Sequence, residues 1–122
     1  MPARYPVTAS PDDSSIPEMT PTELDERLKQ EHPLLLVDVR EPHEIEIADL
    51  PSVGQLRIPV GQFLDRLEEI DPEENLVIYC RSGARSGWAV QQLQERGYDK
   101  VWNLKGGVLS WREDVDPTLT AY

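Results

Sequence analysis

The sequence predicts an α/β domain with a mainly parallel sheet that helices cover on both faces. Short apolar segments alternate along the chain with longer segments in which apolar residues recur at helical spacing. The apolar segments 34–39 and 76–79 do not alternate strictly with polar residues, which is typical of parallel strands covered on both faces. Because strands and helices alternate, we expect right-handed crossovers between the strands.

Length and charge narrow the classes of protein to which the chain can belong. Its 122 residues predict one domain. Its net charge of −11 disfavours nucleic acid and anionic membranes as partners, because both are polyanions. The longest apolar run, 34–37, is too short to span a bilayer, and residues 1–10 lack the apolar core of a signal peptide. We therefore expect a soluble, cytoplasmic protein without membrane or nucleic-acid partners.

The sequence holds one cysteine, Cys80, and two widely spaced histidines. One cysteine cannot form an internal disulfide, and this set of residues disfavours a zinc site. We expect no metal and no organic cofactor.

Residues 1–15 are expected to form a disordered tail ahead of a folded domain over residues 16–122. The tail holds Pro2, Pro6 and Pro11 and shows no apolar periodicity. Such a segment cannot bury enough apolar surface to offset the entropy lost on ordering.

A capping box predicts the first helix. Thr20 and Glu23 are spaced as the two residues of a capping box, in which the side chain of each accepts a hydrogen bond from the backbone N–H of the other. Pro21 stands at the first helical position, which proline favours. The helix is expected to run to about Gln30, before Pro33.

Two strands and two helices are expected next. Segment 34–39 predicts a strand, Pro42 a short helix, and segment 56–58 a short strand that ends at Pro59. Four apolar residues at helical spacing then predict a further helix: Phe63, Leu64, Leu67 and Ile70.

The second half repeats the order of strand and helix. Segment 76–79 predicts a strand, and the helix after it is expected to end at Gly97. Segment 101–104 predicts the last strand. Gly106-Gly107 opens a final short helix and is expected to allow close approach of the backbone.

Cys80 is the candidate nucleophile. It directly follows strand 76–79, and ligands of open α/β sheets bind at the carboxyl ends of strands. The loop between this strand and the next helix turns several backbone N–H groups toward one point, an environment that favours thiolate over thiol. Residues 80–97 carry three arginines and one glutamate, a local charge of +2. The alternative is a buried cysteine that only ends a core strand, but two arginines around Gly83 favour a functional loop.

The segment Cys80–Ser86, CRSGARS, resembles the active-site loop of rhodanese-type sulfurtransferases. Residues 34–51 resemble the Asp-x-Arg segment of that family and the turn after it. Residues 56–59 resemble its next strand, and residues 101–111 its Gly-Gly-x-x-x-Trp signature. The resemblance runs from about Ile16 to Tyr122 and implies a five-stranded sheet.

The resemblance also implies roles for single residues. Cys80 would be catalytic, and the following loop residues would bind the substrate: Arg81, Ser82, Gly83, Ala84, Arg85 and Ser86. We expect Asp38 and Arg40 to form a structural pair that supports the neighbouring loop.

Residues 16–24, 46–51 and 114–122 resemble a narrower group, the rhodanese domain fused behind E1-like adenylyltransferases. Those enzymes serve sulfur carriers in molybdopterin and thiamine-type pathways. Ala48-Asp49 stand where many family members have Gly-His, which we interpret as a character of this group. The resemblance implies a sulfur-carrier protein or an adenylyltransferase as a partner.

The implied activity is that of a thiosulfate sulfurtransferase. Cys80 would take a sulfane sulfur from thiosulfate or a persulfide and pass it to a thiol, cyanide or a sulfur carrier. The alternative is a sulfur-relay or partner-binding module with little activity on small donors. A phosphatase or arsenate reductase is less favoured, because Arg85 lies five positions after Cys80 where related phosphatases have arginine at six.

Overall fold

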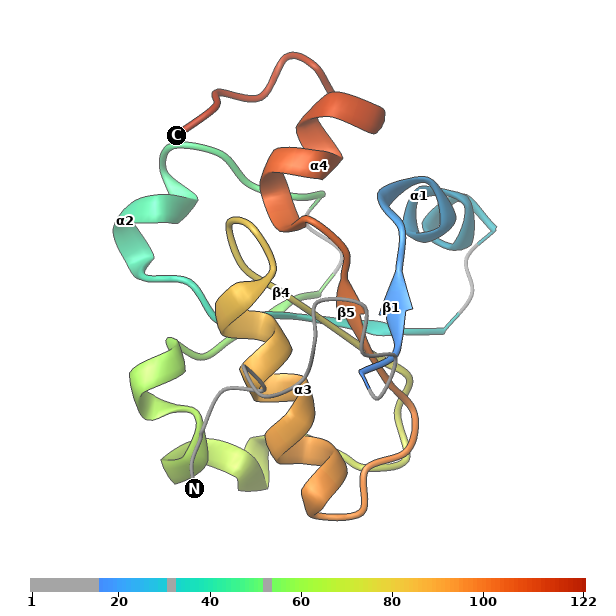
Figure 1. Cartoon of the computed structure of the whole chain (residues 1–122), viewed down its shortest axis with the longest axis vertical. Helices are drawn as coiled ribbons and strands as arrows, with labels where there is room; N and C mark the ends of the chain where they lie inside the picture. The colour runs from blue at the N-terminus through green and yellow to red at the C-terminus, as the bar shows by residue number, and fades with distance from the viewer. Residues whose placement is uncertain (1–15, 31–32, 52–53) are drawn as a thin grey trace.

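Five parallel strands form the centre of the structure, which is a computed structural model (Figure 1). The strands stand in the order β1-β5-β4-β2-β3, and the paired neighbours run parallel. Their bounds are β1 Glu18–Met19, β2 Leu35–Asp38, β3 Leu56–Arg57, β4 Leu76–Tyr79 and β5 Val101–Leu104. The prediction of a five-stranded, mainly parallel sheet is confirmed.

The structure describes residues 16–30, 33–51 and 54–122. The tail that we expect over residues 1–15 lies outside these residues. In the described part of the chain, no helix is long and apolar enough to cross a membrane.

Helix α1 (Pro21–Lys29) begins at the capping box that the sequence predicts. The backbone N–H of Glu23 donates to Thr20 Oγ1 at 3.1 Å, and that of Thr20 donates to Glu23 Oε1 at 2.9 Å. The other α-helices are α2 (Pro42–Ile45), α3 (Ala84–Glu95) and α4 (Gly107–Asp114). Gly97 follows α3 after the capping residue Arg96, so the helix ends where the sequence predicts.

Residues 63–70 differ from the prediction of a single helix. Most of this stretch forms the 3₁₀-helix η3 (Leu64–Glu69), in which Arg66 forms a kink with φ −122° and ψ 24°, and a further 3₁₀-helix, η2 (Val60–Gln62), precedes it. So short a run gains few α-helical hydrogen bonds, and the burial of Phe63 in the core decides its path.

Two hydrophobic clusters lie on opposite faces of the sheet. Helix α3 and the 3₁₀-helices contribute to one cluster, whereas α1 and α4 contribute to the other. Strand β4 and the residue after it show the alternation, because Ile78 and Cys80 belong to the first cluster and Val77 and Tyr79 to the second. Apolar residues on both faces explain why the strand sequences lack strict alternation.

The carboxyl ends of three strands meet at one edge of the sheet. Strand β4 pairs in parallel with β2 on one side and with β5 on the other. Asp38 ends β2, Cys80 follows β4, and Lys105 and Gly106 follow β5. This edge is where open α/β sheets bind their ligands.

Candidate active site

The sulfur of Cys80 lies among hydrogen-bond donors of the loop that follows β4. The backbone N–H groups of Gly83 and Ser86 donate to Cys80 Sγ at 3.1 and 3.4 Å. Ser86 Oγ lies 3.3 Å from the same atom. Gly83 adopts φ 106°, which residues with a Cβ rarely do, and so lets the loop turn back onto the sulfur. Donors in this arrangement stabilise negative charge that develops on an atom between them.

Helix α4 supports the loop through backbone hydrogen bonds. The N–H groups of Val108 and Leu109 donate to the carbonyl oxygens of Cys80 and Arg81, both at 3.0 Å. A Cβ on Gly107 would overlap these two carbonyl groups. The close approach that the sequence predicts at Gly106-Gly107 is therefore present, and it fixes the candidate nucleophile relative to β5.

Asn103 of β5 forms two hydrogen bonds with the loop that follows β4. Its Nδ2 donates to the carbonyl oxygen of Gly83 at 3.2 Å, and its Oδ1 accepts from Ser86 Oγ at 2.6 Å. The sequence analysis does not select Asn103, although a polar residue inside the apolar strand Val-Trp-Asn-Leu is a signal that could have found it. Buried amides need partners, and here the partners are the two loop residues that contact Cys80 Sγ.

Arg85 pairs with Glu44 of α2, a second residue that the sequence analysis does not select. Arg85 Nη1 and Nη2 donate to Glu44 Oε2 and Oε1 at 2.8 and 2.9 Å. The hydrogen bonds from Arg85 lower the pKa of Glu44 to about 2, and the same contact raises the pKa of Arg85. Both terminal nitrogens of Arg85 are thus occupied by a carboxylate.

Arg81 and Tyr122 contact each other at the other side of the loop. Arg81 Nε donates to the backbone oxygen of Tyr122, and Arg81 Cζ lies 5.4 Å from the centre of the tyrosine ring. The Tyr122 hydroxyl accepts from Arg40 Nη1 at 2.9 Å and donates to Glu44 Oε1 at 3.0 Å. Tyr122 is therefore the third partner of the loop that sequence reasoning misses.

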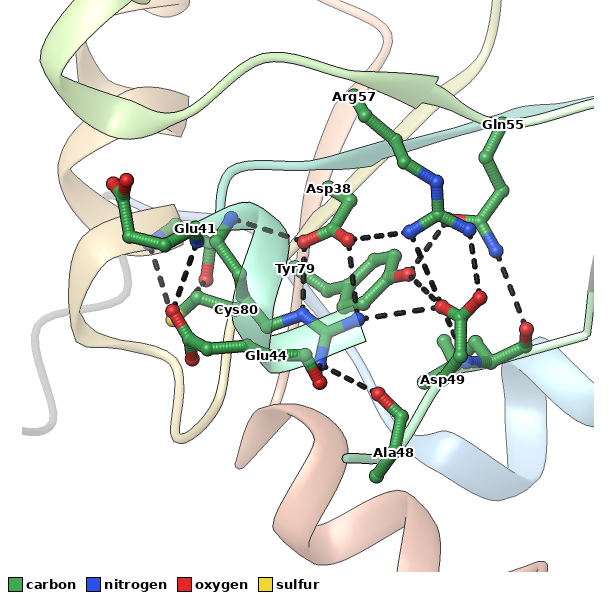
Figure 2. Close-up of polar contacts among 12 residues, drawn as sticks. Asp38, Glu41, Glu44, Ala48, Asp49, Gln55, Arg57, Tyr79 and Cys80 are labelled. Carbon is green, nitrogen blue, oxygen red and sulfur yellow. Dashed lines mark hydrogen bonds and ion pairs between the residues drawn. The ribbon is translucent and has the colours of Figure 1, made fainter. Parts of the chain in front are cut away.

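Asp38 and Arg40 form a buried ion pair at the end of β2, and Figure 2 shows the Asp38 carboxylate with its hydrogen bonds. Asp38 Oδ1 accepts from the backbone N–H and Nε of Arg40 at 3.0 and 2.9 Å, and Asp38 Oδ2 accepts from Arg40 Nη2 at 3.1 Å. Arg40 Nη1 donates to the carbonyl oxygen of Ala48 at 2.8 Å. Arg40 thereby connects the end of β2 to the turn after α2.

Asp49 closes the same network in the turn after α2. Its Oδ2 accepts from Arg57 Nη2 at 2.7 Å, and its Oδ1 lies 3.3 Å from Arg40 Nη2 and 3.2 Å from the Tyr79 hydroxyl. Figure 2 shows the side chains of Asp49, Arg57 and Gln55 gathered around the Tyr79 hydroxyl. Asp38 and Asp49 together balance the charges of Arg40 and Arg57. The Ala48-Asp49 pair, which departs from the Gly-His of many relatives, thus has an acceptor role of its own.

The remaining predicted loop residues differ in exposure. Ser82 and Ala84 are exposed, Arg81, Gly83 and Arg85 are half-buried, and Ser86 is buried with Cys80. The structure therefore brings Cys80, Gly83 and Ser86 into contact and leaves the side chains of Ser82 and Ala84 toward solvent.

This fold and loop are those of a rhodanese-like domain, and a family model described as "Rhodanese-like domain" matches residues 20–114. The chain belongs to the rhodanese-like family. A sulfurtransferase of Allochromatium vinosum is 40% identical over 94 residues, which cover 77% of this chain and 86% of that protein. Sulfur transfer is the general class of activity that the family and this relative support.

Two further similar proteins extend the comparison. The probable adenylyltransferase/sulfurtransferase MoeZ of Mycobacterium tuberculosis is 27% identical over 104 residues, covering 85% of this chain and 26% of MoeZ. The crystal structure of a rhodanese-like domain protein from Staphylococcus aureus superposes with a TM-score of 0.73 at 29% identity, covering 88% of this chain and 99% of that one. These similarities agree with the group of proteins that the sequence resembles.

Proposed function

We propose that the protein is a sulfurtransferase in which Cys80 takes a sulfane sulfur from thiosulfate or a small persulfide and carries it as a persulfide. The observation that carries this proposal is the set of backbone donors at Cys80 Sγ, from Gly83 at 3.1 Å and Ser86 at 3.4 Å. A sulfur atom surrounded by donors at the carboxyl end of β4 suits a nucleophile that must carry negative charge before and after the transfer.

The first half of the reaction loads Cys80. Its thiolate attacks the outer sulfur of thiosulfate, a new sulfur–sulfur bond forms, and the bond inside thiosulfate breaks. Sulfite leaves with the electron pair of the broken bond, and the outer sulfur stays on Cys80 as an anionic persulfide. A persulfide donor reacts in the same way and leaves as a thiolate. This half of the reaction needs no metal or organic cofactor.

The second half unloads Cys80. A thiolate or cyanide attacks the outer sulfur of the persulfide and takes it, and the Cys80 thiolate leaves with the electron pair. Cys80 is the one cysteine of the sequence, so no other thiol within it can accept the sulfur. The acceptor must come from outside these 122 residues, which gives two-step kinetics with alternating donor and acceptor.

The loop supplies donors for the outer sulfur of the persulfide. Within the described residues, the backbone N–H groups of four loop residues have no hydrogen-bond partner: Arg81, Ser82, Ala84 and Arg85. We assign to these groups, together with those of Gly83 and Ser86, the binding of the persulfide and of the oxyanion that leaves. Asp38 and Arg40 are assigned the support of the neighbouring loop.

A second candidate is a sulfur relay in which the donor or the acceptor is a protein. The observation that favours it is the similarity to MoeZ, whose name joins adenylyltransferase and sulfurtransferase. A sulfur-carrier protein or an adenylyltransferase would then be the partner. Faster unloading of the Cys80 persulfide by a sulfur carrier than by small thiols at equal concentration would favour the relay.

Intact-mass spectrometry after incubation with thiosulfate, and separately with glutathione persulfide, tests the proposal. We expect the protein to gain about 32 Da, the mass of one sulfur, and Cys80→Ser to gain nothing. Glu95→Gln changes an exposed residue at the far end of α3 and is the matched control, which should gain the same mass as the parent. An adduct on Cys80→Ser, or none on the parent with either donor, would overturn the proposal.

A further inference from the structure

One guanidinium beside the candidate active site has no aspartate or glutamate partner in the part of the chain that the structure describes. Arg85 is paired with Glu44, and Arg40 and Arg57 are balanced by Asp38 and Asp49. Among the described residues, Arg81 contacts no aspartate or glutamate side chain, and its polar contact is that of Nε with an oxygen of Tyr122. Arg81 is therefore the arginine of this group whose terminal nitrogens are not engaged by an aspartate or a glutamate, in a chain of net charge −11.

The contact with Tyr122 leaves the anion-binding end of Arg81 free. Tyr122 accepts from Nε through its backbone oxygen, and its ring lies against the guanidinium with 5.4 Å between Cζ and the ring centre. Nη1 and Nη2 of Arg81 have no partner in the described part of the chain. These are the nitrogens with which arginine forms bidentate hydrogen bonds to oxyanions.

Tyr122 is itself held in place. Its hydroxyl bonds to Arg40 at 2.9 Å and to Glu44 at 3.0 Å, and Arg40 and Glu44 are both buried. Burial raises the pKa of Tyr122, so the hydroxyl keeps its proton and can donate to Glu44 at neutral pH. The ring thus presents a fixed surface to a side chain that otherwise has four free torsions.

We propose that Tyr122 is a positioning residue that holds Arg81 in place to bind the anionic end of the sulfur donor. The inference rests on the proposed function and names its substrate class, a sulfane donor that leaves as an oxyanion, such as thiosulfate. Holding the guanidinium before binding reduces the entropy lost when the donor arrives. The effect belongs to donor binding, because the Cys80 sulfur and its own donors do not contact Tyr122.

Thiosulfate kinetics with four proteins test this inference: the parent, Tyr122→Ala, Arg81→Ala and the double variant. We expect each single variant to raise the KM for thiosulfate about three- to tenfold with kcat little changed. The double variant should raise KM no further than Arg81→Ala alone, because Tyr122 acts through Arg81. Tyr122→Phe keeps the ring and should give a KM closer to the parent than Tyr122→Ala does.

Unloading provides the control for site integrity. Dithiothreitol attacks as a thiolate and carries no oxyanion group for Arg81 to bind, so it should remove the sulfur from preloaded Cys80 persulfide at the same rate in the parent and in Tyr122→Ala. An unchanged KM in Tyr122→Ala, or increases in KM that multiply in the double variant, would overturn the positioning role. A parent that is loaded by glutathione persulfide but not by thiosulfate overturns this inference alone. A parent that neither donor loads overturns the proposed function and this inference with it.

Discussion

Val108 donates its backbone N–H to the carbonyl oxygen of Cys80 at 3.0 Å, and this bond ties the first turn of α4 to the candidate nucleophile. Leu109 makes the same contact with Arg81. The two bonds require Gly107 to approach the loop so closely that a Cβ would meet the backbone of Cys80 and Arg81. The position of the sulfur thus depends on a glycine of another strand–helix unit.

Gly107→Ala is expected to lower the free energy of unfolding by about 2–4 kcal/mol, because the new methyl group overlaps backbone atoms and φ is 61°. Gly97→Ala is the matched control, since its φ of 91° is also left-handed but nothing lies within 4 Å of the added carbon. That variant should lose about 1–2 kcal/mol. Urea unfolding measures both, and equal losses would contradict the role of the close approach.

Asn103→Leu should slow persulfide formation at Cys80 by about tenfold or more, because Gly83 and Ser86 lose the side chain that holds them against the sulfur. The control is Asn75→Leu, which removes one exposed hydrogen bond to Pro33 at the opposite end of β4. Single-turnover loading followed by mass spectrometry gives the rate. The prediction fails if both variants load at the rate of the parent.

The pair of Glu44 and Arg85 predicts a pH dependence of stability. The pKa of Glu44 is about 2 in the folded protein and 4.5 without the pairing, so the folded state favours the ionised carboxylate. This contribution is complete above about pH 4.5 and is lost as the pH falls toward 2. Its full size is on the order of 3 kcal/mol.

Unfolding free energies at pH 6 and pH 3 measure this contribution. The parent should lose more stability between the two values than Glu44→Gln, which has no carboxylate to protonate. Glu46→Gln, an exposed carboxylate on the next turn, should behave like the parent. The same loss in Glu44→Gln as in the parent would exclude Glu44 as the source.

Contiguity decides which parts of the candidate site the sequence can predict. Cys80–Ser86 lie in one run after an apolar strand, so spacing and residue type reveal the loop. Spacing and residue type do not reveal the partners of the loop arginines, because Glu44 and Tyr122 each lie 41 positions from the arginine that they contact. Only the fold brings such residues together, and the sequence around each of them does not indicate the contact.

The fold shows the same division between strong and weak local signals. The capping box at Thr20 is confirmed because both of its hydrogen bonds are local. Strand β1 is two residues long, too short for a periodic pattern, and it forms through pairing with β5. The 3₁₀ path of residues 64–69 likewise depends on burial against the core rather than on apolar spacing.

Asp38 and Asp49 accept hydrogen bonds from the same two arginines, yet we expect replacement of the two carboxylates to lower the free energy of unfolding by different amounts. The Asp38 side chain is 0% exposed and accepts four hydrogen bonds, whereas that of Asp49 is 28% exposed. Asp38→Asn leaves Arg40 charged and buried, which costs about 3–5 kcal/mol of unfolding free energy. Asp49→Asn weakens a partly exposed pair and should cost about 1 kcal/mol. Both changes keep side-chain size, so urea unfolding of the two variants isolates charge and burial. A cost for Asp49→Asn as large as that for Asp38→Asn would show that exposure does not govern this network.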